Sequence, residues 1–279
     1  MQVNDKVVAI TGAASGIGAA LARRFKAEGA RGIICADLNG DGAAAVAAEV
    51  GGHGMAVNVG SEDDIKRMVA EAEAKFGAID LFCANAGIAV SGGIDTPLSE
   101  WERCWQVNTM HHIYAARAVV PGMIERGGGY LLNTVSAAGL LNQIGSATYA
   151  VTKHAAIGFA EWLSITHGDE GIRVSVLCPQ AVNTPMIAGM SNGGVAGVDG
   201  IIEPEQLAQT VVEGLADERF LILPHPQVLQ YMQRKTGDYD RWLSGMRRLK
   251  AKYGEDALNV WGRNPNPILR DAGCTGSSG

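Results

Sequence analysis

The chain has 279 residues, of which 47% are hydrophobic and 19% are charged. This balance is ordinary for a folded globular protein, and the length suffices for one large domain with a buried core. The 23 lysines and arginines against 29 aspartates and glutamates give a net charge of −6, which argues against sequence-independent binding to nucleic acid or to an anionic membrane. The 37 glycines, nearly twice the usual ~7%, suit many tight turns between strands and helices.

Five cysteines are scattered along the chain: Cys35, Cys83, Cys104, Cys178 and Cys274. None forms a CxxC pair or a Cys/His cluster with zinc-ligand spacing, so we expect buried free thiols in a reducing compartment and no metal site. No charged stretch precedes an apolar core at the N-terminus, and no apolar run approaches the ~18 residues of a membrane span. We therefore expect a cytoplasmic protein without a membrane segment.

Short apolar runs alternate with longer amphipathic stretches. Strands are predicted at 6–11, 32–37, 54–59, 79–84, 130–135, 172–178 and 220–223. Helices are predicted at 16–29, 42–50, 62–76, 99–126, 149–167 and 203–215. Ser99, with Glu102 three residues later, is the expected capping box of the helix 99–126.

Strands that are apolar along nearly their whole length, and separated by helices, indicate a parallel sheet buried on both faces. We therefore expect a single-domain α/β fold, a doubly wound Rossmann-like parallel sheet of about seven strands with helices on both faces, within residues 1–262. Residues 226–254 are predicted to form a C-terminal helical extension whose basic face is solvated. The Pro-, Asn-, Gly- and Ser-rich stretch 263–279 is predicted to be a disordered tail.

A glycine-rich turn separates the first predicted strand from the first helix. Its sequence is Thr11-Gly12-Ala13-Ala14-Ser15-Gly16-Ile17-Gly18. Phosphates bind well at helix N-termini, where backbone N–H groups are unpaired, and glycine has no Cβ to keep them away. The spacing G-x3-G-x-G is neither the common G-x-G-x-x-G fingerprint nor a P-loop, which needs a following Lys-Ser/Thr. The turn predicts a pyrophosphate site, although such glycine sets are weak evidence alone.

Asp37 ends the second predicted strand about 20 residues after the turn, where a carboxylate can accept hydrogen bonds from an adenosine ribose. The same carboxylate would repel a 2′-phosphate, and neither Ser15 nor Leu38 supplies a positive charge. Arg23 and Arg24 lie inside the first helix and are expected to face away. This arrangement favours NAD over NADP; the alternative is that Asp37 is a simple turn residue.

Tyr149 and Lys153 stand at i and i+4 of the predicted helix 149–167, so they share a face. Ser136 follows the strand 130–135, at the carboxyl edge where α/β sheets bind ligands. The Tyr/Lys pair alone is nearly uninformative, because many helices carry it by chance. It becomes specific in combination with the glycine turn, the strand-end aspartate and the strand-end serine.

With these motifs together, the sequence resembles the short-chain dehydrogenase/reductase family over roughly residues 5–225. The matching residues are Thr11-Gly12-x3-Gly16-x-Gly18, Asn85-Ala86-Gly87, Asn108, Ser136 and Tyr149-x3-Lys153. The sequence departs from the family pattern at Ala84, where the family often has asparagine, and at Gln180, where it usually has glycine after proline. The second departure bears on the backbone shape beside the nicotinamide.

The resemblance implies an NAD-dependent oxidoreductase that transfers a hydride between nicotinamide and a secondary alcohol or ketone. It implies four catalytic residues: Tyr149 as the acid or base, Lys153 lowering its pKa, Ser136 holding the substrate oxygen, and Asn108 keeping a water beside Lys153. Lowering a phenol pKa from about 10 by about three units needs ~4 kcal/mol, which a neighbouring buried charge can supply. The implied NAD contacts are Thr11, Gly12, Ser15, Gly16, Ile17, Gly18, Asp37, Leu38, Asn58, Val59, Asn85, Ala86, Gly87, Tyr149, Lys153, Pro179, Val182 and Thr184. No metal is needed, and His111, His112 and His154 have no matching role.

A substrate lid is expected at about 184–200, where Met186, Ile187 and Met190 are either substrate contacts or core residues. Together with Leu140, Leu141, Ile144 and the aromatic residues between Tyr231 and Trp261, they favour a bulky apolar small-molecule substrate. Two other functions stay open: a catalytically silent NAD-binding sensor or scaffold, and a sugar-nucleotide epimerase or dehydratase, which would resemble a longer chain. The helices 99–126 and 149–167 carry surplus apolar surface, and family members pair these helices, so a homotetramer or homodimer is expected.

Overall fold

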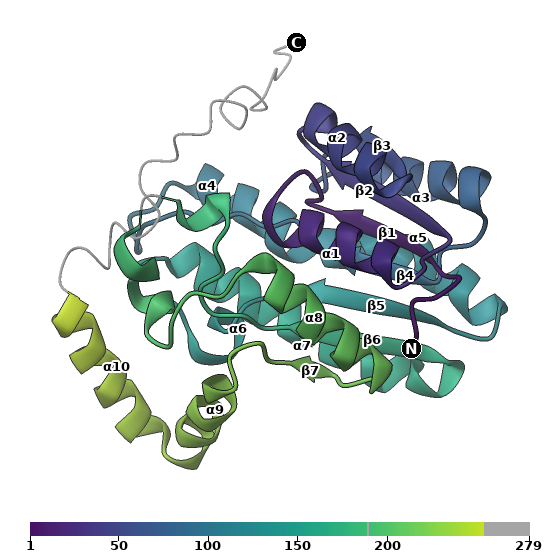
Figure 1. The fold of residues 1–279 in the computed structure, drawn as a ribbon. Helices are drawn as coiled ribbons and strands as arrows, with labels where there is room; N and C mark the ends of the chain where they lie inside the picture. The colour runs from purple at the N-terminus through teal and green to yellow at the C-terminus, as the bar shows by residue number, and fades with distance from the viewer. Residues whose placement is uncertain (189, 254–279) are drawn as a thin grey trace, which may run out of the picture.

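A computed structural model describes residues 1–188 and 190–253. Within them, seven parallel strands form a sheet in the order β3-β2-β1-β4-β5-β6-β7 (Figure 1). The strands are β1 Val7–Thr11, β2 Gly32–Asp37, β3 His53–Ala56, β4 Leu81–Ala84, β5 Gly129–Thr134, β6 Ile172–Leu177 and β7 Leu221–Ile222. The predicted seven-stranded, doubly wound parallel sheet is confirmed.

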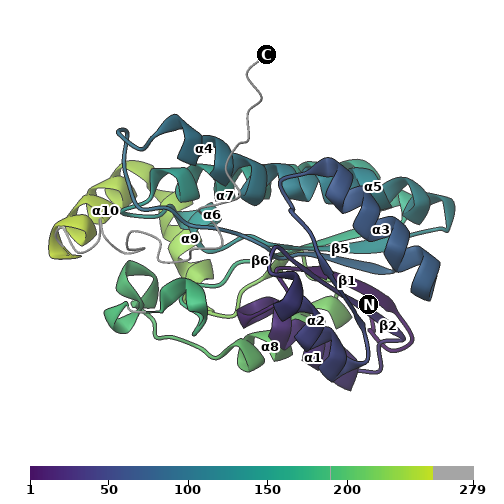
Figure 2. The ribbon, with the colours of Figure 1, turned by 90° about the horizontal axis from the view of Figure 1, so that it is seen from above.

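Helices cover both faces of this sheet, which is why strands such as β1 and β4 are buried throughout (Figure 2). One face carries α1 Gly16–Ala27, α2 Gly40–Val50 and α8 Pro204–Ala216, and the other carries α3 Glu62–Phe76, α5 His111–Glu125 and α7 Ala147–His167. After β3 the chain changes face through α3 and returns to form β4 beside β1, so the strand order reverses between β1 and β4. The carboxyl ends of these two strands therefore flank the crevice where doubly wound sheets bind ligands.

The region predicted as one helix over 99–126 consists of three elements. The helix α4 (Leu98–Trp105) is followed by a π-helical turn, η1 (Gln106–Met110), and then by α5. The capping box predicted at Ser99 is wrong, because the helix begins at Leu98 after Pro97, and no side chain caps its N-terminus. Proline fixes a backbone φ suited to a helix entrance, so Ser99 already lies inside the first turn.

The other boundaries differ in smaller ways. The strand predicted at 54–59 ends at Ala56, because β2, its only partner, ends opposite it at Asp37. A short helix, α6 (Ala138–Leu141), was not predicted. The predicted C-terminal extension is two helices, α9 (Gln227–Gly237) and α10 (Tyr239–Tyr253), and α10 leads away from the sheet in Figure 1.

The extension is divided at Asp238, whose backbone is extended and whose carboxylate accepts a hydrogen bond from the Arg241 N–H at 3.0 Å. The expected lid region contains two 3-10 segments, η3 (Pro185–Ile187) and η4 (Ser191–Gly197). The predicted tail 263–279 lies outside the described residues. Among those described, no helix has both the length and the apolarity to cross a bilayer.

The cysteines that the structure describes are all buried and unbridged, as expected: Cys35, Cys83, Cys104 and Cys178. Cys274 lies outside the described residues. Burial raises the pKa of the Cys35 and Cys178 thiols to about 12, so these side chains are neutral packing groups.

Candidate active site

The glycine-rich turn after β1 has a geometry that only glycine allows. Gly12 has a φ of +66°, and a Cβ there would lie 2.9 Å from the Ala86 Cα. A Cβ on Gly18 would lie 2.1 Å from the Gly12 carbonyl oxygen, so α1 packs directly onto the turn. Ser15 begins α1 without making a side-chain cap, which leaves the first N–H groups without that partner. This close-packed cradle at a helix N-terminus fits the predicted pyrophosphate.

The turn is closed on its outer side by the region expected to form the lid. A Cβ on Gly16, which has a φ of +51°, would lie 3.0 Å from the Thr184 methyl carbon. Val182, two residues earlier, is buried and pairs with Ile202 through an isolated parallel bridge. Thr184 therefore lies against the turn, and the cofactor contacts expected of Thr184 and Val182 stay predictions.

Asp37 holds the turn to the end of β2. Its carboxylate accepts hydrogen bonds from the N–H groups of Ala14, at 3.1 Å, and Asn39, at 3.0 Å. The two arginines of α1 face elsewhere, as predicted: Arg23 pairs with Glu49, at 2.6 Å, and Arg24 with Glu28, at 2.6 Å. The carboxylate of Asp37 is thus fixed at the strand end, without compensation from either arginine.

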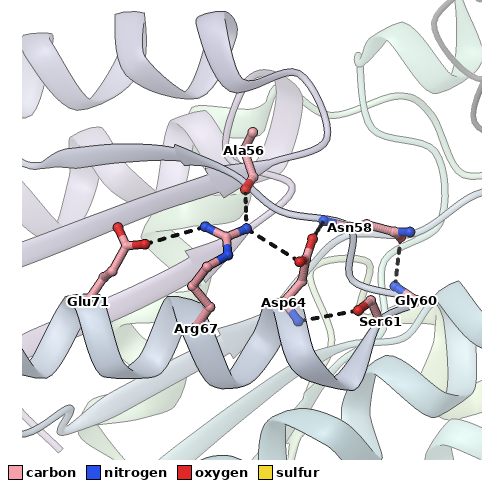
Figure 3. A network of polar contacts seen from close by, with 7 residues as sticks. All are labelled: Ala56, Asn58, Gly60, Ser61, Asp64, Arg67 and Glu71. Atoms are coloured by element: carbon pink, nitrogen blue, oxygen red, sulfur yellow. Dashed lines mark hydrogen bonds and ion pairs between the residues drawn. The ribbon is translucent and has the colours of Figure 1, made fainter.

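Asn58 lies in the loop that follows β3 at the same edge of the sheet (Figure 3). Its backbone N–H donates to the Asp64 carboxylate at 2.8 Å, and its side-chain oxygen accepts from the Gly60 N–H at 3.0 Å. Arg67 braces the same carboxylate, at 3.5 Å, and donates to the Ala56 carbonyl at 2.9 Å. These contacts hold the loop that carries Asn58 and the buried Val59 in place at the end of β3.

Asn85 ties together the ends of three strands. Its N–H donates to the Thr11 hydroxyl at 2.9 Å and its side-chain amide to the Thr11 carbonyl at 3.0 Å, while its side-chain oxygen accepts from Thr134 at 3.0 Å. Beyond it, a Cβ on Gly87 would lie 3.3 Å from the Lys153 nitrogen and 3.4 Å from the Asn108 oxygen. The segment Asn85-Ala86-Gly87 thus links the glycine turn to the residues expected to be catalytic.

Asn108 lies in the π-helical turn, and the oxygen and the nitrogen of its side-chain amide both bind the backbone of Ile88. Its oxygen accepts from the Ile88 N–H at 2.9 Å, and its nitrogen donates to the Ile88 carbonyl at 2.9 Å and to the Thr152 hydroxyl at 3.1 Å. Asn108 therefore fixes the chain just after Gly87. The water-holding role expected for it stays a prediction.

Ser136 and Tyr149 meet at the carboxyl edge of β5. The backbone of Ser136 has a φ of +147°, unusual for a residue with a side chain. Its hydroxyl accepts from the Ala138 N–H at 3.1 Å, lies 3.5 Å from the Pro179 carbonyl oxygen, and is hydrogen-bonded to the Tyr149 hydroxyl. Ser146 caps α7 by accepting from the Tyr149 N–H at 3.3 Å, so the helix begins where it can present Tyr149 to this edge.

Lys153 lies one helical turn after Tyr149, on the same side of α7. Its nitrogen is 5.5 Å from the centre of the Tyr149 ring and donates to the Thr134 carbonyl at 3.1 Å. Burial lowers the pKa of Lys153 to about 8 and raises the pKa of Tyr149 to about 12, the hydrogen bond with Ser136 opposing the second shift. Both neutral forms are thus favoured by burial, and ionising the phenol requires added positive charge.

Two adjacent histidines form hydrogen bonds to residues at the ends of β1 and β5, a role that the sequence analysis did not predict. His111 and His112 are buried with their rings stacked 5.3 Å apart. A ring nitrogen of His111 lies 3.1 Å from the Thr11 hydroxyl, and one of His112 lies 2.9 Å from the Asn133 side-chain oxygen. Burial lowers the pKa of His112 to about 3, so its ring is neutral. The sequence feature that could have indicated this role is their position directly after Asn108.

The remaining expectations concern side chains around the opening. His154 points away from Tyr149, as predicted, and its Nε2 lies 3.4 Å from the Lys235 nitrogen on α9. Met186 is exposed, and none of Pro185–Ile187 is buried, which disfavours the core-packing alternative for that part of the segment. The Pro179 carbonyl accepts from the Ala137 N–H at 2.8 Å, so Pro179 lies beside Ser136.

Comparison with known proteins agrees with this geometry. A family model described as short chain dehydrogenase matches residues 6–193. The chain is 37% identical over 253 residues to the 1-deoxy-11-beta-hydroxypentalenate dehydrogenase of Streptomyces exfoliatus, covering 88% of this chain and 92% of that protein. It is 32% identical over 225 residues to the cyclohexanol dehydrogenase of Acinetobacter sp. (strain SE19), covering 77% of this chain and 89% of that one.

A crystal structure of a short chain dehydrogenase/reductase from Burkholderia phymatum in complex with NAD shares the fold. Its TM-score is 0.79 at 24% sequence identity, covering 86% of this chain and 96% of that chain. The fold and the family match thus define a Rossmann-like oxidoreductase of a family that uses a nicotinamide cofactor. The chain belongs to the short-chain dehydrogenase/reductase family, whose named members similar to it include dehydrogenases of hydroxyl compounds.

Proposed function

We propose that this protein is an NAD-dependent dehydrogenase or ketoreductase acting on a bulky, apolar secondary alcohol or ketone. One observation carries the proposal: the hydroxyls of Ser136 and Tyr149 are hydrogen-bonded to each other at the edge of the sheet, with the Lys153 ammonium behind the phenol ring. A substrate oxygen placed between those hydroxyls could accept a hydrogen bond from each of them and exchange a proton with Tyr149.

The residues of this chain divide the work of proton transfer. Ser136 holds the substrate oxygen, and Tyr149 takes the alcohol proton at its phenolic oxygen during oxidation or donates it during reduction. Bound nicotinamide supplies the hydride acceptor or donor. Because the pKa of Tyr149 is about 12, bringing it near neutrality takes roughly 7 kcal/mol of differential stabilisation. That requires the buried charge of Lys153 together with the positive charge of the oxidised cofactor.

The choice of NAD rests on Asp37. Its carboxylate is fixed by the N–H groups of Ala14 and Asn39 and would lie against any 2′-phosphate. The similar protein from Burkholderia phymatum was crystallised with NAD. These two facts support the predicted preference for NAD over NADP.

The apolar substrate is supported by side chains near the opening and by the relatives. Leu140 and Ile144 follow Ser136 in the chain, and Met186 and Ile187 lie in the segment after Thr184. Some relatives of this chain are named for ring compounds, namely a hydroxypentalenate, cyclohexanol and a 3beta-hydroxysteroid, and others for the acyclic butanediol and threitol. These names favour a dehydrogenase over the sugar-nucleotide epimerase or dehydratase.

A direct test follows NADH absorbance at 340 nm with cyclic secondary alcohols and, in parallel, with acyclic polyols. The proposal predicts turnover of the cyclic alcohols at higher kcat/KM than the polyols, with NAD preferred to NADP. NADH binding without turnover of any alcohol or ketone would instead support the silent sensor or scaffold. Faster turnover of polyols would overturn the apolar substrate class alone.

The expected homotetramer or homodimer is supported by uncovered apolar side chains on α7. Val151, Trp162 and Ile165 share one side of this helix, and Ile165 is 83% exposed. We propose that α7 and the α4–α5 region form the interface. Sedimentation should give an oligomer for the wild type and a smaller species for Ile165→Asp; a monomeric wild type would contradict this. The cytoplasmic location and the lack of nucleic-acid or membrane partners stay predictions.

A further inference from the structure

A buried histidine bridges two segments that approach the site from different parts of the chain. His225 follows β7, and its side chain is only 3% exposed. Its Nδ1 accepts a hydrogen bond from the Gln180 backbone N–H at 3.2 Å. A ring nitrogen that accepts carries no proton, so the neutral imidazole carries its proton on Nε2.

The other side of the ring faces the end of the expected lid. The Gly200 carbonyl and the Asp199 carboxylate are close enough to oppose the burial that lowers the pKa of His225. Yet in the described part of the chain, Nε2 completes no hydrogen bond, and neither does the buried Oδ2 of Asp199. The other carboxylate oxygen, Oδ1, accepts from the Tyr231 hydroxyl of α9 at 2.9 Å. The buried Nε2–H thus has the Gly200 carbonyl nearby without completing a hydrogen bond of good geometry, and the neighbouring Asp199 Oδ2 has no hydrogen-bond partner among the described residues.

The contact with Gln180 leads back to the candidate active site. The preceding carbonyl, that of Pro179, accepts from the Ala137 N–H at 2.8 Å and lies 3.5 Å from the Ser136 hydroxyl. Fixing the Gln180 N–H therefore fixes the peptide against which Ser136 is oriented. Because this contact uses the backbone, it does not depend on the unusual side chain at position 180.

We propose that His225 is a positioning residue for the reaction, a neutral imidazole that orients the Ser136 loop through Nδ1 and holds Asp199 and Gly200, at the end of the expected lid, through Nε2–H. In the substrate complex, Nε2–H would pair with the Asp199 Oδ2. The proposal rests on the proposed function, since it assigns Ser136 and the segment 184–200 their roles in that reaction. It assigns His225 no contact with the reacting atoms.

Two substitutions at His225 test the roles of its two ring nitrogens separately. His225→Asn keeps an acceptor near the Nδ1 position and loses the donor toward Asp199, whereas His225→Gln reaches toward the Nε2 position and loses the acceptor for Gln180. We expect His225→Asn to raise KM for the alcohol about tenfold with kcat within about threefold of wild type. We expect His225→Gln to lower kcat about tenfold with a smaller change in KM.

Hydrogen exchange of the backbone, measured by mass spectrometry, tests the same split without relying on turnover. His225→Gln should speed exchange in peptides that contain Gln180, and His225→Asn should speed it in peptides that contain Asp199 and Gly200. If the wild type oxidises no alcohol, the proposed function fails, while the exchange pattern still decides the bridging role. The same exchange pattern in both variants, or the same kcat and KM losses in both, would overturn the proposal.

Asp199→Asn provides a third variant that leaves the histidine in place. Its Oδ1 keeps the acceptor for Tyr231, while the charge and one acceptor are removed. It should raise KM as His225→Asn does. The KM of the double variant Asp199→Asn/His225→Asn should be no higher than that of either single variant, because both substitutions remove the same interaction. Independent, additive losses would contradict the pairing. An unchanged KM in Asp199→Asn alone would contradict it too, even if the His225 variants fail to fold.

Discussion

The Lys153 ammonium lies 5.5 Å from the centre of the Tyr149 ring and is held there by the Thr134 carbonyl at 3.1 Å. Both side chains are buried, and burial shifts the pKa of each toward its neutral form. Buried ionisable groups with such shifts cost folding free energy and concentrate at functional sites. At pH 7 this cost falls on Lys153, because the phenol of Tyr149 is neutral in the folded and in the unfolded chain.

Replacing Lys153 should remove that cost. The folded pKa of Lys153, about 8, lies below the ordinary 10.5, so between these values the unfolded chain binds more protons and wild-type stability rises with pH. Lys153→Met should be inactive yet at least as stable as wild type at pH 7. Its advantage should shrink by roughly 3 kcal/mol between pH 8 and pH 10.5. Urea unfolding of both proteins across this range measures the difference, and a difference independent of pH would contradict the shift.

The glycine turn should not tolerate a single added methyl group. A Cβ on Gly18 would lie 2.1 Å from the Gly12 carbonyl oxygen, so Gly18→Ala must push α1 off the turn. We expect a loss of about 1–3 kcal/mol in stability and at least about tenfold weaker NADH binding, measured by fluorescence titration. Gly237→Ala is the matched control, since a Cβ there meets nothing within 4 Å. Equal NADH affinity in Gly18→Ala and Gly237→Ala would show that the turn is not part of the cofactor site.

Asp37 should decide between the two nicotinamide cofactors. Asp37→Asn removes the charge and keeps one oxygen, which can accept from one of the two N–H groups that now bind separate carboxylate oxygens, whereas Asp37→Ala removes both acceptors. In each variant, kcat/KM for NADP relative to NAD should rise by about tenfold or more, because repulsion of the 2′-phosphate is lost. Asp37→Ala should also loosen the turn and weaken NAD binding more than Asp37→Asn, because it loses both backbone contacts and not one of them. A ratio that stays at the wild-type value in both variants would show that another residue selects the cofactor.

Much of the fold follows from sequence because its signals are local. Strands such as Val7–Thr11 are apolar throughout, since both faces of the sheet are covered, and the helices between them keep a clear period. Tyr149 and Lys153 could be paired from spacing alone, because α7 is a regular helix between its two ends.

The features that were missed depend on contacts outside the local pattern. The π-helical turn that carries Asn108 joins α4 to α5 with helical backbone angles at both ends, so no break between them can be read from the sequence. Pro97 overrode the capping signal of Ser99, and Asp238 divides a stretch whose apolar pattern reads as one helix. The contact between Gln180 and His225 joins residues 45 positions apart, and no periodicity predicts it.

The most direct test of the account compares Tyr149→Phe with wild type in two assays on the same preparations: NADH binding by fluorescence titration, and oxidation of a cyclic secondary alcohol at 340 nm. We predict unchanged NADH affinity, within about twofold, and a fall in kcat of at least about a thousandfold, since the phenol is the group that moves the proton. An unchanged kcat would show that another group accepts the proton, and would contradict the mechanism built on Tyr149, Lys153 and Ser136.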